Sequence, residues 1–464
     1  MLKNYNCIAA ISSPPGKGGV AIIRISGEDA LDLAAEFFFP ASGRSFLEAK
    51  PRMQTYGYII DDGERIDDVL ATYFPAPHSY TGENIVEIGC HGGILVTSLV
   101  LETILKKGAR AAEAGEFTKR AFINGRLSLT EAEAIGNLLE AQSREQVKLA
   151  SSTSRRNLTD AIADIRRDIT DVMSSIYARI DYPDEDLGDY TDGEVKERLD
   201  SIRKKAVALR NTYKTGKAIR ECVSTVIVGK PNVGKSSLYN AILGEDRAIV
   251  TDVAGTTRDM LSESIPLGKV MLRISDTAGI RERENVDLVE SIGIEKSEKA
   301  LAESELIFTI FDLSREFDAE DERLLDSVKA ANGTKIAILN KSDLPKKFDE
   351  SKLAGTFIET IRVSAKGDGA ELCERLAGLV NALFTDEKIL IGDGAVISSA
   401  RQNASLTRAI EGIDVALENL NLGFPQDLIS SDIERALEAI SELDGRAVSE
   451  EIVADIFSKF CVGK

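Results

Sequence analysis

Hydrophobic and polar side chains alternate with two different periods along this chain, and the period changes near residue 119. In residues 1–118, short runs rich in β-branched residues predict strands at Ile8–Ile11, Val20–Ile25, Tyr56–Ile60, Val69–Phe74 and Ile85–Ile88. Helical periodicity covers Asp29–Phe38 and Leu95–Lys107. We therefore expect an N-terminal α/β domain over residues 1–118.

A helical pattern with few Gly or Pro residues follows over residues 119–216, interrupted only by the acidic segment Asp181–Asp186. A similar pattern resumes after residue 385, with apolar residues at Leu406, Ile410, Ile413, Leu417 and Leu420, and a second run ends in Ile452, Ile456, Phe457 and Phe460. Strands and helices alternate in between, over residues 217–385. We expect one all-helical domain, 119–216 plus 386–464, interrupted by a Ras-like P-loop domain with a doubly wound, mostly parallel sheet. Stacking the two helical halves would bury stripes that neither half could bury alone.

Composition narrows the class of protein. The chain has 464 residues, of which 43% are hydrophobic and 29% charged, and no run approaches the roughly 18 apolar residues of a membrane span. The N-terminus lacks a secretory signal pattern. Five scattered cysteines, without metal-ligand spacing, indicate reduced thiols. We expect a cytoplasmic protein that does not act in a membrane, and the presence of only two histidines argues against a histidine-rich catalytic or metal site.

The formal net charge of −19 argues against a broad surface that coats nucleic acid, because neutralising phosphates requires clustered cations. Three groups could still form a local basic patch, namely Arg155-Arg156, Arg166-Arg167 and Arg203-Lys204-Lys205. Such groups on long helices are also typical of ordinary solvated faces, and the sequence leaves both interpretations open.

One segment carries a specific chemistry. The strand-like run Val223–Val228 leads into Gly229-x-x-x-x-Gly234-Lys235-Ser236, the P-loop pattern in its strand–loop–helix context. Backbone N–H groups of such a loop, with the positive end of the following helix, surround phosphate oxygens. Lys235 would reach the β- and γ-phosphates, and the Ser236 hydroxyl would ligate Mg²⁺. The alternative, a turn that binds nothing, is disfavoured because all four defining positions are filled.

Three later motifs select the base. Asp276-Thr277-Ala278-Gly279 follows the strand Val270–Ile274, and Asn340-Lys341-Ser342-Asp343 follows Lys335–Leu339. The Asp343 carboxylate can accept both N1–H and N2–H₂ of guanine, and adenine would leave it unpaired at a cost of about 1–3 kcal/mol or more. Ser364-Ala365-Lys366, after the strand Phe357–Val363, would contact guanine O6. In this order the motifs predict a GTP-binding domain.

The segment Thr251–Asp259 resembles switch I of the GTPase branch that includes Era, EngA and MnmE (TrmE). The resemblance implies Thr257 as the second hydroxyl ligand of Mg²⁺, beside Ser236.

Ile280 stands where Ras-like enzymes carry a water-orienting Gln, so charge stabilisation must come from elsewhere, such as K⁺. K⁺ would be bound by Asn232, Thr251, Val253 and Thr256, although Asn232 could instead only cap the loop. The full set of expected GTP contacts is Asn232, Val233, Gly234, Lys235, Ser236, Ser237, Thr251, Asp252, Val253, Ala254, Gly255, Thr256, Thr257, Asp276, Thr277, Ala278, Gly279, Asn340, Lys341, Asp343, Ser364, Ala365 and Lys366.

Four long motifs outside this domain resemble the MnmE family: Pro15–Gly27, Ser79–Glu87, Ala114–Leu127 and Phe460–Lys464. They span the whole chain, with small departures at Val462 and Arg126. The resemblance implies that 5-formyl-tetrahydrofolate binds to Arg24, Glu87, Arg126 and Lys464. It also implies catalytic roles for Lys235, for Glu290 as an indirect positioner of water, and for Cys461, although that thiol could merely pack beside Phe460.

The family resemblance implies a homodimeric, K⁺-activated GTPase that works with the FAD protein MnmG on tRNA. The pair would install a carboxymethylaminomethyl or aminomethyl group at C5 of the wobble uridine, with the folate as one-carbon donor. The C-terminal tail would then reach an N-terminal domain, which we expect to be that of the other subunit. A rival hypothesis is an Era- or EngA-like ribosome-assembly switch, but we find no second P-loop and no suitable GXXG loop. A scaffold with a degenerate nucleotide site conflicts with the intact guanine and Mg²⁺ residues.

Overall fold

The computed structural model describes residues 6–182, 191–243, 262–275, 299–364 and 369–464. These residues form two compact units, the first made of residues 6–139, 153–182, 191–203 and 408–464, the second of residues 140–152, 204–243, 262–275, 299–364 and 369–407. Two of the four divisions fall within the long helices α7 (Asp192–Asn211) and α14 (Ala400–Asn421), and the other two fall near the ends of α4 (Leu129–Glu140) and α5 (Arg144–Ser154).

A seven-stranded sheet dominates the first unit, in the order β3-β4-β5-β6-β2-β1-β7. All neighbouring strands are antiparallel except β1 and β7. The strands are β1 (Ile8–Ile11), β2 (Val20–Ser26), β3 (Phe38–Pro40), β4 (Gln54–Asp61), β5 (Glu64–Phe74), β6 (Ile85–His91) and β7 (Arg110–Ala111). Each strand predicted from the sequence in this segment is present.

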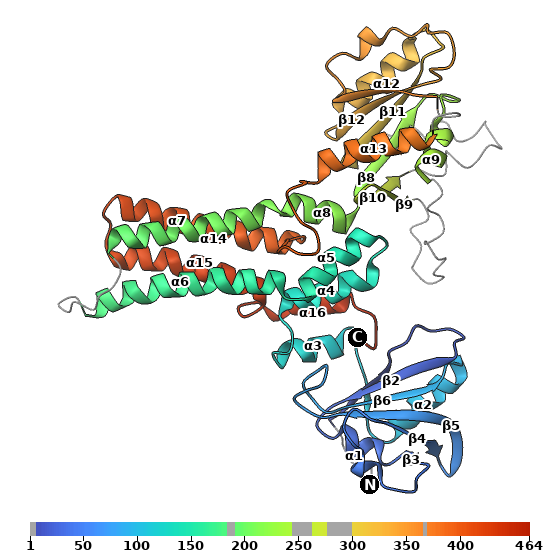
Figure 1. The fold of residues 1–464 in the computed structure, drawn as a ribbon, viewed down its shortest axis with the longest axis vertical. Helices are drawn as coiled ribbons and strands as arrows, with labels where there is room; N and C mark the ends of the chain where they lie inside the picture. Colours follow the sequence, from blue (N-terminus) through green and yellow to red (C-terminus); the bar gives the residue numbers. More distant parts are fainter. Residues whose placement is uncertain (1–5, 183–190, 244–261, 276–298, 365–368) are drawn as a thin grey trace. The chain divides into compact units, whose positions relative to one another are not determined.

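One face of this sheet is packed and the other is open. On β2, Ile23 and Ile25 are fully buried whereas Val20 and Ile22 are exposed, the alternation expected of a strand with one solvated face. The packed face lies against α1 (Ala30–Ala34) and α2 (Ile94–Lys106) (Figure 1). Arg24, two residues after Ile22, therefore points to the same side of the sheet as Val20 and Ile22, and at the end of the strand the next residue on that side, Ser26, is buried.

The predicted helix Asp29–Phe38 is wrong in its second half. The helix α1 ends at Ala34, and Phe38–Pro40 forms the edge strand β3 instead. Phe38 pairs with Ile59 of β4, and its ring packs edge-on against Phe46 with centroids 4.7 Å apart. This tertiary pairing outweighs the local helical periodicity.

Helices from both ends of the chain pack together in the first unit. Helices α6 (Asn157–Asp181) and α15 (Gln426–Asp444) lie side by side (Figure 1), and they bury Ile162, Ile165, Ile169 and Val172 against Ile429, Ile433 and Ile440. This confirms that two helical halves, separated in sequence by the P-loop segment, bury each other's apolar stripes. This unit also contains α3 (Glu116–Ile123), α4 (Leu129–Glu140) and α16 (Glu450–Ser458), together with the first part of α7 and the second part of α14.

The second unit is built on a six-stranded sheet in the order β13-β12-β11-β8-β10-β9, parallel except for the edge strand β9. The strands are β8 (Val223–Gly229), β9 (Ser262–Leu267), β10 (Val270–Ser275), β11 (Leu306–Asp312), β12 (Thr334–Asn340) and β13 (Glu359–Arg362). Helices α9 (Lys235–Leu243) and α13 (Gly369–Phe384) contribute to the core on one face. Helix α12 (Ala319–Ala330) packs with Val226 and Ile307 on the other. The unit is therefore doubly wound, as predicted.

Two further helices belong to the second unit, α5 (Arg144–Ser154) and α8 (Tyr213–Glu221). Among the helices that the structure describes, none combines the length and apolar character needed to cross a membrane.

Candidate functional site

The glycine-rich loop lies at the carboxyl end of a central strand. Strand β8 ends at Gly229 and α9 begins at Lys235, so the loop bridges strand and helix as the motif requires. Because β8 lies between β11 and β10, the loop stands where the connections diverge to opposite faces of the sheet. Ligands of open α/β sheets bind at this position.

Gly234 brings the loop against the base motif. Its φ of +111° lies in the region that favours glycine, and any Cβ added there would overlap the side-chain nitrogen of Asn340. The buried Asn340 Nδ2 donates a hydrogen bond to the Val233 carbonyl over 2.7 Å. The first residue of the predicted guanine motif therefore supports the phosphate loop directly.

The Lys235 ammonium lies inside the loop, where it donates to the carbonyls of Gly229 (2.7 Å) and Lys230 (3.0 Å). Asn232 has a φ of +63°, a left-handed conformation that asparagine tolerates. Its side chain is exposed and forms no hydrogen bond with the residues that the structure describes. The interpretation of Asn232 as a simple cap therefore gains no support.

The sequence did not predict that Lys230, in the P-loop, forms ion pairs with the start of α12. Lys230 Nζ contacts Asp318 (2.7 Å) and Asp321 (2.8 Å), which form a capping box at the start of α12. Hydrogen bonds from Lys230 and from the Asp321 and Glu320 amides lower the pKa of Asp318 to about 2. The Asp318-x-x-Asp321 helix start is visible in the sequence, but no pattern in the sequence pairs it with Lys230.

Asp312, at the end of β11, was also missed. Its buried carboxylate contacts Lys341 Nζ at 2.5 Å and accepts hydrogen bonds from the Ser314 amide and hydroxyl. Although burial alone would raise its pKa, these hydrogen bonds hold the pKa of Asp312 below its usual value. Asp312 thus fixes the lysine of the Asn-Lys-x-Asp motif, whose φ is +63°.

The other base-recognition residues lie at the same edge of the sheet. Asp343 is exposed just beyond β12, and Ser364 follows β13. The Ser342 amide donates to the Val363 carbonyl over 3.1 Å, which brings the two segments together. Other predicted residues lie outside the described residues, namely Thr251, Asp252, Val253, Ala254, Gly255, Thr256, Thr257, Asp276, Thr277, Ala278, Gly279, Glu290, Ala365 and Lys366.

Changing Gly234 to Ala should weaken GDP binding by about 10²-fold, because the methyl group would displace Asn340 and break its bond to the Val233 carbonyl. Isothermal titration calorimetry would measure the dissociation constant. Gly355→Ala is the matched control, since Gly355 has a φ of +77° but nothing within 4 Å of an added Cβ. Equal losses in both variants would show that backbone strain, and not the Asn340 contact, is responsible.

A second group of predicted residues lies in the first unit. Arg24 and Glu87 face each other across β2 and β6, and Arg24 Nε donates to Glu87 over 2.9 Å. The Arg24 guanidinium carbon lies 5.2 Å from the centre of the Tyr80 ring and 5.6 Å from that of Phe117. Arg24 is therefore held by a carboxylate and two aromatic rings.

Arg126 and the C-terminal tail approach the same neighbourhood. Arg126 Nε donates to the Ser79 carbonyl over 3.2 Å, next to Tyr80. The Phe117 amide donates to the Lys464 carbonyl over 3.1 Å. The structure therefore joins Arg24, Glu87, Arg126 and Lys464 through the loop at Ser79–Glu83 and helix α3.

The tail lies against the N-terminal segment of its own chain, which corrects the expectation that it reaches the other subunit. The Ser12 hydroxyl donates to the Gly463 carbonyl over 3.0 Å, and Val462 forms a β-bridge with Ala114. Helix α16 leads into the tail and packs Phe457 against Phe122, so a short connection suffices. Cys461 is exposed.

Glu87 also lines a cavity of about 550 Å³ on the open face of the sheet. Its lining is mainly apolar, with a few polar side chains. Its lining includes Val20, Ile22, Tyr56, Asp68, Leu70, Thr72, Glu87 and His91.

The candidate basic groups are largely paired with acidic neighbours. Arg167 contacts Asp164 at 2.8 Å, Arg166 approaches Asp444 at 3.8 Å, and Arg203 pairs with Asp414. Arg156 lies 3.8 Å from Glu131. These contacts favour ordinary ion-paired helix faces over a nucleic-acid patch.

A P-loop that meets an Asn-Lys-x-Asp motif at the carboxyl edge of a doubly wound sheet defines a GTP-binding protein of the P-loop class. Two family models match the rest of the chain: the N-terminus of the GTP-binding protein TrmE over residues 7–126, and the MnmE helical domain over residues 129–461. The chain belongs to the MnmE (TrmE) family of tRNA modification GTPases.

Curated relatives match along their full length. The tRNA modification GTPase MnmE of Clostridioides difficile is 40% identical, over 98% of this chain and 99% of the relative. That of Finegoldia magna is 41% identical, over 99% and 100%. An Aquifex aeolicus Era variant bound to GDP.AlF4- superposes with a TM-score of 0.26 at 26% identity, over 40% of this chain and 65% of that one, which is too low to add to the family assignment.

Proposed function

We propose that this protein hydrolyses GTP in order to modify the wobble uridine of certain tRNAs in the cytoplasm. The main observation in favour of GTP binding is the hydrogen bond from Asn340 to the Val233 carbonyl, because it joins the base-recognition motif to the phosphate loop. The relatives are named tRNA modification GTPases, which supports the proposed role in tRNA modification. We infer that residues 217–385 form the GTPase domain, between an N-terminal domain over 1–118 and a helical domain of 119–216 plus 386–464.

In this proposal each nucleotide contact has a defined task. Lys235 leaves the loop carbonyls to bind the β- and γ-phosphates, and Asp343 accepts the two guanine N–H groups. The Ser236 hydroxyl, in the first turn of α9, fits the hard oxygen ligand that Mg²⁺ prefers, and Thr257 would be its second hydroxyl ligand. Bound Mg²⁺ supplies positive charge for the transferred phosphoryl group. Glu290 would orient the attacking water indirectly.

We infer that K⁺ activates hydrolysis through Asn232, Thr251, Val253 and Thr256. Asn232 fits this role because its exposed side-chain oxygen lies on the loop and has no other task among the described residues. Hydrolysis should accordingly be fast in K⁺ and slow in Na⁺. Asn232→Ala should lose most of the K⁺ activation, about 10-fold or more, with GDP binding largely intact. Steady-state phosphate release in the two salts measures this, and equal wild-type rates in both would refute the cation site.

The first unit supports the proposed folate site. Glu87 would accept hydrogen bonds from the pterin ring next to its ion-pair partner Arg24, while Arg126 and Lys464 would attract the glutamate tail. Of these four residues only Glu87 lines the adjacent cavity, so the cavity would receive the pterin end of the ligand. When bound, 5-formyl-tetrahydrofolate supplies the one-carbon unit, and Cys461 at the docked tail is a candidate active-site thiol.

We also propose a homodimer that works with the flavoprotein MnmG. Exposed apolar side chains on the open sheet face, including Val20, Ile22 and Leu70, offer a surface for the second copy, and because they also line the cavity beside Glu87, a second copy there would border the proposed folate site. The test of the whole function is nucleoside analysis of tRNA from cells that lack this protein. The modified wobble uridine should disappear and return with the wild-type gene but not with Lys235→Ala, and a normal nucleoside profile in the deletion strain would refute the tRNA role.

A further inference from the structure

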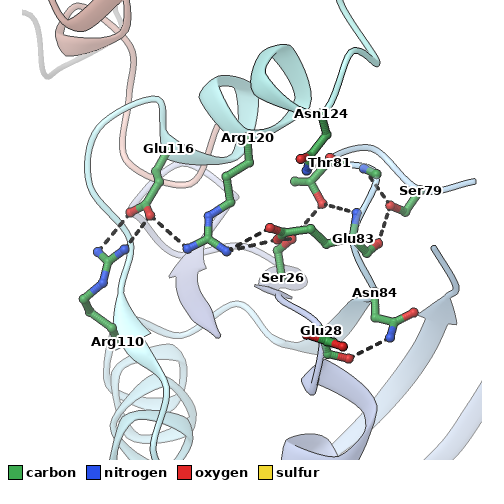
Figure 2. Close-up of polar contacts among 11 residues, drawn as sticks. Ser26, Glu28, Ser79, Thr81, Glu83, Asn84, Arg110, Glu116, Arg120 and Asn124 are labelled. Carbon is green, nitrogen blue, oxygen red and sulfur yellow. Dashed lines mark hydrogen bonds and ion pairs between the residues drawn. The ribbon is translucent and has the colours of Figure 1, made fainter. Parts of the chain in front are cut away.

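Four charged side chains connect helix α3 with the sheet of the first unit (Figure 2). The Arg120 guanidinium donates to both oxygens of Glu83 (3.2 and 3.0 Å) and to Glu116 (3.1 Å). Arg110 completes the set with hydrogen bonds to Glu116 of 3.0 and 2.5 Å. Two carboxylates thus face two guanidiniums, and Arg120 is the member that contacts both carboxylates.

Glu83 is anchored on its other side to the strand β2. Its carboxylate accepts a hydrogen bond from the Ser26 hydroxyl over 2.8 Å, and Ser26 lies 2.7 Å from the Thr81 hydroxyl. Ser26 and Thr81 are completely buried. Through Glu83, Arg120 therefore connects α3 to the buried end of β2.

The two segments joined by Arg120 carry the surroundings of the proposed folate residues. The Ser79–Glu83 loop presents the Tyr80 ring to Arg24 and the Ser79 carbonyl to Arg126. Helix α3 presents the Phe117 ring to Arg24 and the Phe117 amide to the tail. The position of the loop relative to α3 consequently sets how Arg24, Arg126 and Lys464 converge.

From this arrangement we propose that Arg120 is a positioning residue of the folate site: by bridging Glu83 and Glu116 it holds the Ser79–Glu83 loop and helix α3 in the binding arrangement without touching the ligand. This inference rests on the proposed folate-binding function. Arg120 is not one of the four residues predicted to contact the folate.

The chemistry explains why an arginine is needed. A planar guanidinium can bond two carboxylates at once through separate N–H groups, whereas an ammonium acts as a point charge. Glu116 is buried, which alone would raise its pKa, yet hydrogen bonds from Arg110, the Glu113 amide and Arg120 keep that pKa below its usual value. Without Arg120, Glu83 loses its guanidinium partner and the two carboxylates repel each other across the junction.

The test compares variants of the full-length protein for binding of 5-formyl-tetrahydrofolate by isothermal titration calorimetry. Arg120→Met should weaken binding at least about tenfold, because charge-assisted hydrogen bonds are removed from both sides of the junction. Arg120→Lys should recover part of the loss. Arg110→Met is the matched control: Arg110 bonds Glu116 but not Glu83, so binding should remain within about threefold of wild type.

GTP hydrolysis reports on the integrity of the same preparations, since its proposed residues lie in the other unit, and its kcat should stay unchanged in every variant. If Arg120→Met fails to fold, Glu83→Gln removes one charge with little change in shape and should weaken folate binding in the same direction. Wild-type folate affinity in folded Arg120→Met, or an equal loss of folate affinity in Arg110→Met, would overturn the role of Arg120 and leave the folate assignment in place. No binding by the wild-type protein would reject the folate assignment itself, and the role of Arg120 with it.

Discussion

Replacing Asp343 by Asn should reduce GDP affinity by about 10²-fold or more, because a site built to accept two guanine N–H groups would then present an amide donor to them. Xanthine nucleotides carry a carbonyl where guanine carries its amino group, so their affinity should rise. The expectation follows from the position of Asp343 beyond β12, two residues after Lys341, whose ammonium is fixed by the buried Asp312. Competition of GDP and XDP for a fluorescent nucleotide measures both changes.

Asp326→Asn provides a matched control for this experiment. Asp326 lies on the exposed side of α12 in the same unit and contacts only Lys329 among the ion pairs described, at 3.6 Å. The control should bind both nucleotides as the wild type does. Unchanged GDP affinity in Asp343→Asn would show that another residue recognises the base.

Removing Cys461–Lys464 should abolish wobble-uridine modification while GTP hydrolysis continues. The tail contacts the N-terminal segment through Ser12, Ala114 and Phe117, whereas the proposed phosphate and base residues belong to the other unit. Nucleoside analysis should show a complete loss of the modification. The kcat of GTP hydrolysis should fall less than about twofold, because distant sites usually act independently.

Two point variants separate docking from thiol chemistry. Gly463 has a φ of +96°, and a Cβ at this position would overlap the Ile11 carbonyl, so Gly463→Ala should undock the tail with the thiol retained. Cys461→Ser should leave the tail docked. Modification lost in Gly463→Ala but kept in Cys461→Ser would make the tail a positioning segment, and normal modification by the truncated protein would refute any role for it.

Much of the site could be predicted because its information is local. The P-loop, the Asn-Lys-x-Asp motif and the strands before them depend on consecutive residues, and the doubly wound order of β8, β10, β11 and β12 then brings their carboxyl ends to one edge. The alternation of side chains along β2 is local in the same way, because successive residues of a strand point to opposite faces of the sheet.

Other features depend on partners far away in the chain. Phe38–Pro40 is a strand because β4 pairs with it, although its own periodicity is helical. Lys230 and Asp321 are 91 residues apart, and no local pattern links them.

The sequence by itself determined the family, the order of the motifs and the residue types able to bind GTP, since these follow from spacing along the backbone. Only the tertiary structure decided that Asp312 holds Lys341, that Arg120 bridges Glu83 and Glu116, and that the tail docks on its own chain. Each of these contacts joins groups whose distance is set by how sheets and helices pack. Packing depends on the whole set of buried side chains, so these contacts could not be read from any one segment.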